Sequence, residues 1–344
     1  MPRLTRRTRL TRPLAAATLV LAAAMLVACS DSGSDRLTVY SGRTSNLISP
    51  LLEQFSEETG IALDVRYDDS ANLALLIDEE GDRTPADVFI SQSPGAEGFL
   101  DEAGRLGTLD ESVLGLVDES NRSDDGSWVG LSGRVRVLVY NTDEVDEADL
   151  PDSVLDLSAP EYEGRVAVAP TNGSFQDFVT AMRSELGDDT TTEWLDGMAD
   201  NGSPTYANNN AIVEAVGRGE GPMGLVNHYY NERALAEDPD QPSANHFFPD
   251  GDIGSLLLET AVSVIDGTDQ RDDAQQLVEF LLSEQAQTFF AEETFEYPLA
   301  AGVEPVDAFV PLSELSLARV DLDELGGGLE RTTELIEQSG LAAG

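Results

Sequence analysis

The chain has 344 residues, and 41% of them are hydrophobic, which is enough to bury a large core. Its 65 acidic residues outnumber 20 Arg, with no Lys, so the net charge of −45 argues against unaided binding to nucleic acid, because phosphate contacts need a basic surface. A single Cys and two His exclude an internal disulfide framework and most zinc enzymes. The acids are spread along nearly every segment, which is typical of a solvated surface and indicates nothing about a ligand.

The first 28 residues have the pattern of an export signal. Five Arg precede an apolar run over 14–28, which has no acidic residue and is short for a membrane span. The run ends in LVAC, followed by SDSGS, and this pattern resembles the lipobox of bacterial lipoproteins, whose Cys becomes the lipidated first residue. We therefore expect a signal peptide at 1–28, a tether at 29–35 and a lipid on Cys29 that anchors the protein outside the cytoplasm. The alternative is an ordinary signal peptide with a buried Cys.

Strands and helices alternate in the next hundred residues. Apolar patterning predicts strands at 37–40, 63–67 and 88–90, and helices at 47–55, 72–80 and 96–100, the first of these helices stopped by Gly60. Such alternation favours a mainly parallel sheet with flanking helices.

A second α/β series follows. We expect strands at 133–141, 166–169 and 223–226, helices from Ser174, around 191–198 and at 211–216, a returning strand at 256–265 with a helix over 274–281, a turn at 325–328 and a last helix at 329–336. The chain then crosses twice between two lobes, and two crossings make a hinge. The predicted lobes are 36–134 plus 257–310, and 135–256 plus 311–344.

No pattern indicates catalysis. His228 and His246 lie outside any recognisable nucleophile motif. The segment 121–126 starts like a calcium loop, but Ser132 stands where that loop needs a bidentate Glu. Without lysine there is no phosphate-binding loop. We therefore expect no nucleotide hydrolysis and find little support for other catalysis.

The segment GLVNHYY stands apart, because it places two tyrosines where a strand ends and a helix begins. One interpretation puts one tyrosine in the core and the other on the surface. The other interpretation uses both phenol oxygens, since a hard trivalent cation can displace a proton whose pKa is near 10. If this stretch is extended, His228 points away from Tyr229 and is a structural histidine.

At this point the chain resembles a known family, the iron(III)-binding proteins that serve bacterial ABC importers. The resemblance runs through LTVYSGR, ADVFIS, WVGLSGRVRVLVYN, YEGRVAVAPTNGSF, GLVNHYY and EYPL, in that order, and covers most of the chain after the signal segment. It implies the two-lobed α/β fold of type II periplasmic binding proteins, with the ligand in the cleft between the lobes. It also implies capture of Fe³⁺ and its delivery to a membrane permease, by a protein expected to be a monomer.

The resemblance implies a role for each matching residue. Tyr229 and Tyr230 are the expected metal ligands, Asn172, Gly173, Ser174, Arg134 and Arg136 the expected anion-binding residues, and Asn209 and Asn227 the expected residues behind the ligands. Backbone N–H groups at a helix start do attract oxyanions. Each assignment has a plainer alternative: a helix cap for 172–174, an ion pair for the arginines and backbone capping for the asparagines. We expect one of the two arginines to face the cleft.

Two positions depart from the family pattern. Thr44 stands where members often have His, and Gln92 stands where they have Glu. A hydroxyl and an amide coordinate a hard cation more weakly than imidazole and carboxylate do. We therefore expect carbonate, citrate or another anion to complete the coordination of Fe³⁺, or the iron to arrive as a chelate.

Three other classes remain open. The tyrosines could stack on an organic ligand such as a polyamine, a phosphonate or a sugar, which Thr44 and Gln92 favour. The chain could also be an exported hydrolase with a carboxylate pair, or a surface adhesin or structural lipoprotein.

Overall fold

The computed structural model describes residues 36–303, 309–320 and 328–343. The predicted signal segment, the tether and Cys29 lie outside these residues, as does most of the turn predicted at 325–328. Within the described part of the chain, none of the helices combines the length and the apolar character needed to cross a membrane.

The described residues form a mixed α/β fold. The helices are α1 Ser45–Thr59, α2 Ser70–Glu80, α3 Pro94–Glu102, α4 Glu111–Leu114, α5 Gly173–Asp200, α6 Asn209–Gly217, α7 His228–Glu237, α8 Arg271–Leu281, α9 Glu284–Glu292 and α10 Leu329–Ser339. The strands are β1 Leu37–Ser41, β2 Leu63–Tyr67, β3 Val88–Ser91, β4 Leu106–Gly107, β5 Trp128–Asn141, β6 Val166–Ala167, β7 Met223–Asn227, β8 Ser243–His246, β9 Leu257–Ile265 and β10 Tyr297–Pro298.

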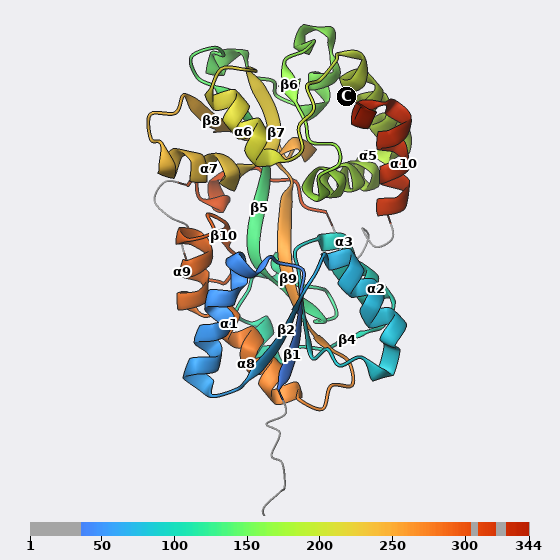
Figure 1. Cartoon of the computed structure of the whole chain (residues 1–344), viewed down its shortest axis with the longest axis vertical. Helices are drawn as coiled ribbons and strands as arrows, with labels where there is room; N and C mark the ends of the chain where they lie inside the picture. The colour runs from blue at the N-terminus through green and yellow to red at the C-terminus, as the bar shows by residue number, and fades with distance from the viewer. Residues whose placement is uncertain (1–35, 304–308, 321–327, 344) are drawn as a thin grey trace, which may run out of the picture. The chain divides into compact units, whose positions relative to one another are not determined.

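Two strands, β5 and β9, join the two halves of the fold. The strand order is β2-β1-β3-β9-β5-β7-β6, and β5 belongs both to the sheet of β1, β2, β3 and β9 and to the sheet of β6, β7 and β8. In Figure 1, β5 and β9 run side by side between a lobe that holds α1, α2, α3 and α8, the first lobe, and a lobe that holds α5, α6, α7 and α10, the second lobe. The predicted two-lobed α/β fold is confirmed.

The prediction of mainly parallel sheets is wrong. Among the strands of the described residues, the pairs β1–β2, β1–β3 and β6–β7 are parallel. In contrast, β9 runs antiparallel to β3, β4 and β5, and β5 runs antiparallel to β7, β8 and β10. The physical reason lies in the crossings: β5 takes the chain out of the first lobe and β9 brings it back, so the two strands must run in opposite directions.

Most predicted elements are found within a few residues of their expected bounds. The strand predicted at 63–67 is β2, and Gly60 ends α1 with a left-handed φ of 77°, a conformation that glycine adopts without steric cost. The helices expected from Ser174 and around 191–198 form one element, α5, with a break at Gly187. The strand expected at 133–141 begins earlier, at Trp128, because its first residues pair with β9.

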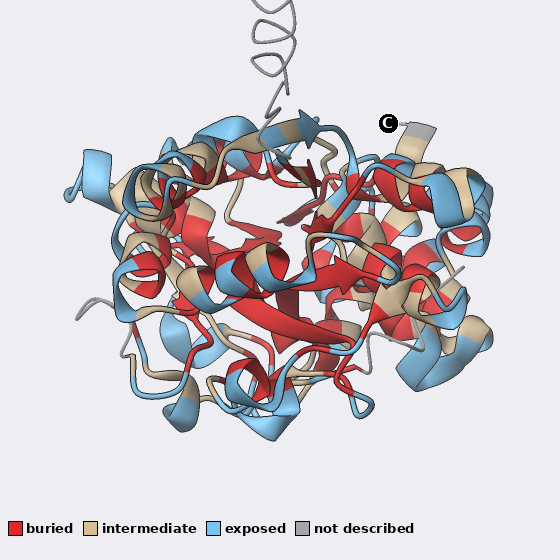
Figure 2. Ribbon diagram, turned by 90° about the horizontal axis from the view of Figure 1, so that it is seen from below, coloured by how far each residue is buried: buried red, intermediate tan, exposed pale blue. Residues whose placement is uncertain are grey.

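The crossing strands and β7 form the buried centre and the helices cover it, whereas the edge strand β2 is largely exposed. Every residue of β5, β7 and β9 is buried. Figure 2 shows this arrangement, with buried strands inside and helices whose outer faces are exposed. Helices α1 and α8 pack Phe55 and Leu277 into the core of the first lobe, and α5 packs Phe178 into that of the second. This burial fixes the path of the crossing strands.

A buried ion pair holds the first lobe to the crossing strands. The Arg43 guanidinium lies 2.9 Å from the Glu296 carboxylate, and it also donates to Thr260 of β9 at 3.0 Å. Ser132 of β5 donates to the same Glu296 oxygen at 2.7 Å. Burial raises the pKa of Glu296, but Arg43 and Arg134 more than compensate, so this pKa lies below its usual value.

We expect Glu296→Gln to destabilise the fold by about 3–5 kcal/mol, because it leaves the Arg43 charge buried without its counter-ion. The measurement is the free energy of unfolding in urea. Glu220→Gln, which removes one carboxylate from an exposed pair with Arg218, is the matched control and should leave stability unchanged. Equal stability of the two variants would contradict this role for the buried pair.

Candidate functional site

The two tyrosines lie at the start of α7, directly after β7. Tyr229 is buried and Tyr230 is partly exposed, and their rings stack with centroids 4.2 Å apart at an interplanar angle of 29°. The Arg233 guanidinium lies 4.6 Å from the centre of the Tyr229 ring. Burial, reinforced by Tyr230, raises the pKa of Tyr229 well above its ordinary value. The Tyr229 phenol is therefore protonated at neutral pH unless a bound cation displaces the proton.

The structural role of His228 stays a prediction, whereas the expectation that its side chain points away from Tyr229 is wrong. The helix begins at His228, so the segment is not extended, and the two rings meet edge to face at 6.0 Å. The His228 Nδ1 accepts a hydrogen bond from the Val135 N–H at 3.1 Å. Burial lowers the pKa of His228 to about 3, so the imidazole is neutral.

Arg136 of β5 lies behind the tyrosines and is almost fully buried. Its Nη1 donates to Asn227 Oδ1 at 3.0 Å and to Asn209 Oδ1 at 3.5 Å. Burial lowers the pKa of Arg136 to about 10, partly offset by the nearby Tyr230 and Tyr229 phenols. The Arg136 guanidinium therefore lies within electrostatic range of both tyrosines.

Asn172 and Ser174 join the same network from the start of α5. Asn172 is the N-cap residue, and its Oδ1 accepts from the Ser174 N–H at 3.2 Å and the Ser174 hydroxyl at 2.6 Å. Asn209 Nδ2 donates to both side chains, at 3.0 Å and 3.1 Å. Gly173 between them is exposed, and a Cβ added there would meet nothing within 4 Å. The N-terminus of a long helix is thus both capped and open to an anion.

Arg134 reaches in the other direction, toward the first lobe. Its Nη2 donates to the backbone oxygen of Gln92, directly after β3, and to that of Glu259 at 3.5 Å. Both arginines lie on the same face of β5, because the strand stays regular here and residues two apart share a face. The expectation that one of them faces the cleft stays a prediction. Arg134 acts on the pKa of Tyr229, and Arg136 interacts with both tyrosines.

Arg134 and Arg136 each have hydrogen-bond donors without a partner among the described residues. Among the described residues, no partner reaches Arg134 Nε, or Nε and Nη2 of Arg136, although all three atoms are buried. Two further buried atoms, the donor Asn227 Nδ2 and the acceptor Gln92 Oε1, also have no hydrogen-bond partner among the described residues. Leaving a buried charged donor unpartnered costs more than an ordinary hydrogen bond contributes. The cluster is therefore suited to a ligand that brings several oxygen atoms.

Thr44 is not brought into this network. It is the exposed residue before α1 and its side chain makes no capping hydrogen bond. The described contacts of this region run instead through the neighbouring Arg43. Within the part of the chain that the structure describes, no group of three or more His, Cys, Asp or Glu could hold a metal ion.

Asp177 is a residue of this region that the sequence patterns did not predict. It lies on α5 one turn after Ser174, and its Oδ1 accepts from the Ser93 hydroxyl of the first lobe at 2.8 Å. Burial raises the pKa of Asp177 to about 6, against the lowering effects of Ser93 and Arg134. The three-residue spacing from Ser174 was the available signal, since such residues share a helix face.

Comparison with known proteins fits this geometry. Residues 83–323 match the family model described as "Bacterial extracellular solute-binding protein". The chain belongs to this family. It is 32% identical over 329 residues to the major ferric iron-binding protein of Neisseria meningitidis serogroup A, covering 93% of this chain and 97% of that protein.

Solved structures agree with this assignment. The iron-bound HitA of Pseudomonas aeruginosa superposes on this solute-binding protein with a TM-score of 0.81 and 33% identity, over 89% of this chain and 99% of that one. A Trichodesmium protein in complex with iron and citrate gives 0.77 and 25%, with the same coverage of both chains. The two-lobed fold is therefore that of type II periplasmic binding proteins.

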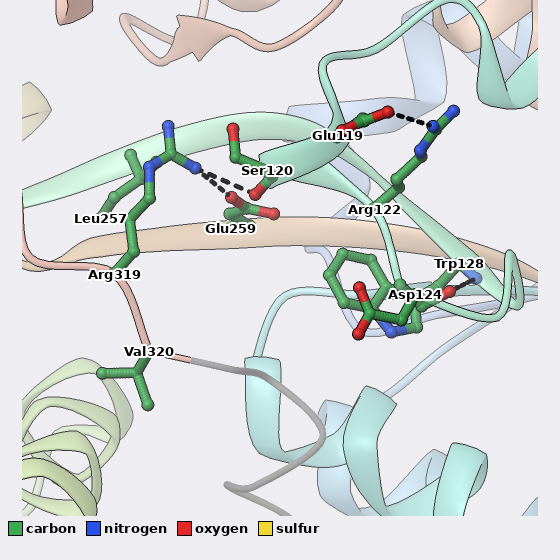
Figure 3. Close-up of a pocket in the computed structure, with 10 residues that line it drawn as sticks. Glu119, Ser120, Arg122, Asp124, Trp128, Leu257, Glu259, Arg319 and Val320 are labelled. Carbon is green, nitrogen blue, oxygen red and sulfur yellow. Dashed lines mark hydrogen bonds and ion pairs between the residues drawn. The ribbon is translucent and has the colours of Figure 1, made fainter.

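This solute-binding protein also has a polar pocket of about 270 Å³ beside β9 (Figure 3). The Arg319 guanidinium donates to Glu259 at 3.2 Å, to Asn121 Oδ1 at 2.7 Å and to the Ser120 backbone oxygen at 3.1 Å. In the β5–β9 register Glu259 is opposite Gly133, so its side chain points away from the face of Arg134. Burial raises the pKa of Glu259 to about 7.

Because the pKa of Glu259 is higher in the folded chain than in the unfolded one, its contribution favours folding at low pH and is lost as the pH rises through about 7. We expect the stability of Glu259→Gln, measured as the free energy of unfolding, to increase relative to that of the wild type as the pH is raised from 5 to 8. Urea unfolding at several pH values measures the difference, with Glu334→Gln, from an exposed pair, as control. A pH-independent difference would contradict the raised pKa.

Proposed function

We propose that this protein is the extracytoplasmic substrate-binding protein of an ABC importer and that it captures ferric iron through Tyr229 and Tyr230. The observation that carries the proposal is the pair of adjacent tyrosines beside a buried guanidinium with unused donors. Relatives and solved structures that bind ferric iron support it.

The proposed chemistry begins with the two phenols. Fe³⁺ displaces their protons, and the bound metal and the phenolates stabilise each other. The Arg136 charge lowers the cost of the phenolates, and the Arg233 guanidinium over the Tyr229 ring does the same. The two rings stack on each other, so the adjacent side chains extend in nearly the same direction from the start of α7.

An anion completes the coordination. We assign it to the exposed start of α5 at Asn172, Gly173 and Ser174, and to the unused donors of Arg134 and Arg136. Asn209 and Asn227 hold the Arg136 side chain in place through their Oδ1 atoms. Since Thr44 and Gln92 supply neither imidazole nor carboxylate, the anion is citrate, carbonate or another chelating oxyanion.

Capture ends in lobe closure. The proposed lobes are 36–134 plus 257–310, and 135–256 plus 311–344, and β5 and β9 are the strands that bend. The Ser93–Asp177 hydrogen bond already joins the two lobes in this structure. The closed monomer is the form that the permease recognises. A lipid on Cys29 keeps the protein at the membrane surface.

Titration with ferric citrate tests the tyrosines. We expect a visible phenolate-to-iron charge-transfer band in the wild type and its loss in the double variant Tyr229→Phe, Tyr230→Phe. Tyr67→Phe, at an exposed tyrosine of β2, is the matched control and should keep the band. A band that survives the double substitution, or that is absent from the wild type, would sink tyrosine ligation.

A second test concerns the pH dependence of capture. Protons compete with Fe³⁺ for the two phenolates, so the affinity for ferric citrate should fall as the pH is lowered from 7.5 to 5.5. Equilibrium competition with a chelator of known iron affinity measures this, after correction for the chelator's own titration. An affinity that does not change over this range would count against phenolate ligands.

The anion assignment is tested by Arg136→Gln. We expect the affinity for ferric citrate to fall by about 10–100-fold, because a charge-assisted hydrogen bond contributes about 1.5–3 kcal/mol. Arg331→Gln, at an exposed ion pair, is the control and should bind like the wild type. Unchanged affinity in Arg136→Gln would place the anion elsewhere.

A further inference from the structure

A second cavity, of about 330 Å³, lies between the lobes and apart from the tyrosines. Its walls come from α2 and α3 of the first lobe and from α5 and α10 of the second. Figure 1 shows these four helices on the same side of the crossing strands. The Ser93–Asp177 hydrogen bond forms part of the wall. A molecule in this cavity would touch both lobes at once.

Most of the lining is apolar. Ala71, Ala74, Ala96 and the Phe99 ring form the wall from the first lobe. Leu75 of α2 and Leu329 of α10, at 59% and 39% exposure, add two large apolar side chains from opposite lobes. Single exposed leucines are common on protein surfaces, but here two of them line one concave site. The lining fits a hydrocarbon or aromatic body.

The charges of the lining have one sign. Asp177 and Glu330 are its only ionisable side chains among the described residues, so no cation lines the cavity. The Asp177 carboxylate has the Ser93 hydroxyl as donor, and the pKa of Asp177 stays raised, at about 6, despite Arg134 and Arg136. Desolvation therefore raises the pKa of this carboxyl group by more than Ser93, Arg134 and Arg136 lower it. A cation bound beside the Asp177 carboxylate would stabilise its ionised form.

We propose that this interlobe cavity is a second ligand site, which binds a small organic cation with an ammonium group on Asp177 and an apolar body against Phe99, Leu75 and Leu329. The ammonium group forms a charge-assisted hydrogen bond with the Asp177 carboxylate. The apolar body of the ligand is removed from water and packs against methyl groups and the Phe99 ring, which is favourable. Neither tyrosine lines the cavity, so the proposal does not require tyrosine ligation of iron, although Asp177 also interacts with Arg134 and Arg136.

The test is calorimetric titration of the full chain with benzylammonium, and with benzyl alcohol and benzoate as neutral and anionic analogues of the same shape. We expect benzylammonium to bind more tightly than either analogue. Asp177→Asn keeps an acceptor for Ser93 and should weaken benzylammonium by about 10–100-fold. Asp196→Asn, an exposed position on the same helix, is the matched control and should bind like the wild type.

A second variant keeps the test decisive if Asp177→Asn fails to fold. Leu329→Ser removes apolar lining and should weaken benzylammonium, whereas Leu186→Ser, at an exposed leucine of α5 outside the cavity, should not. The double variant Tyr229→Phe, Tyr230→Phe should retain the site, which separates it from the iron proposal. Absence of binding at millimolar benzylammonium, equal binding of benzyl alcohol or benzoate, or no effect of the cavity variants would overturn the proposal.

Discussion

The pairing of β5 with β9 is the constraint on which the rest of the structure depends. β5 is fully buried, it takes part in both sheets, and it carries Arg134 and Arg136 two residues apart on one face. One arginine reaches the main chain of Gln92 in the first lobe, and the other reaches Asn227 in the second. The strand pair that connects the lobes therefore also brings positive charge to the junction between them.

Burying this charge is costly, and the surroundings are arranged to limit the cost. Asn209 and Asn227 satisfy one nitrogen of Arg136, and the tyrosine phenols favour the charged guanidinium electrostatically. Other donors stay unpartnered among the described residues. In a protein of net charge −45, these two buried arginines are the reason for placing the proposed oxyanion where the lobes meet.

The sequence predicted the helices and strands of β1 to α3 well, because their apolar residues follow a clear period and Gly60 marks a stop. It missed β8 and β10, which are two to four residues long and are held by pairing with β5 and not by their own pattern. It also missed the antiparallel direction of β9, since alternating strands and helices do not reveal where a chain crosses between lobes. The sequence did not predict Asp177 for a related reason, since Asp177 is held by a hydrogen bond from Ser93, which is 84 positions away.

By itself the sequence determined the class of the fold, the place of Tyr229 and Tyr230 at a strand-to-helix junction, and the residues at the start of α5, because local periodicity and capping depend on neighbours along the chain. Only the tertiary structure decided that both arginines serve one cluster, that Thr44 stays outside it, and that Asp177 faces the first lobe. Those facts depend on burial and on contacts between segments far apart in sequence. Desolvation, which shifts the pKa values of Tyr229, Arg136 and Asp177, exists only once those segments pack together.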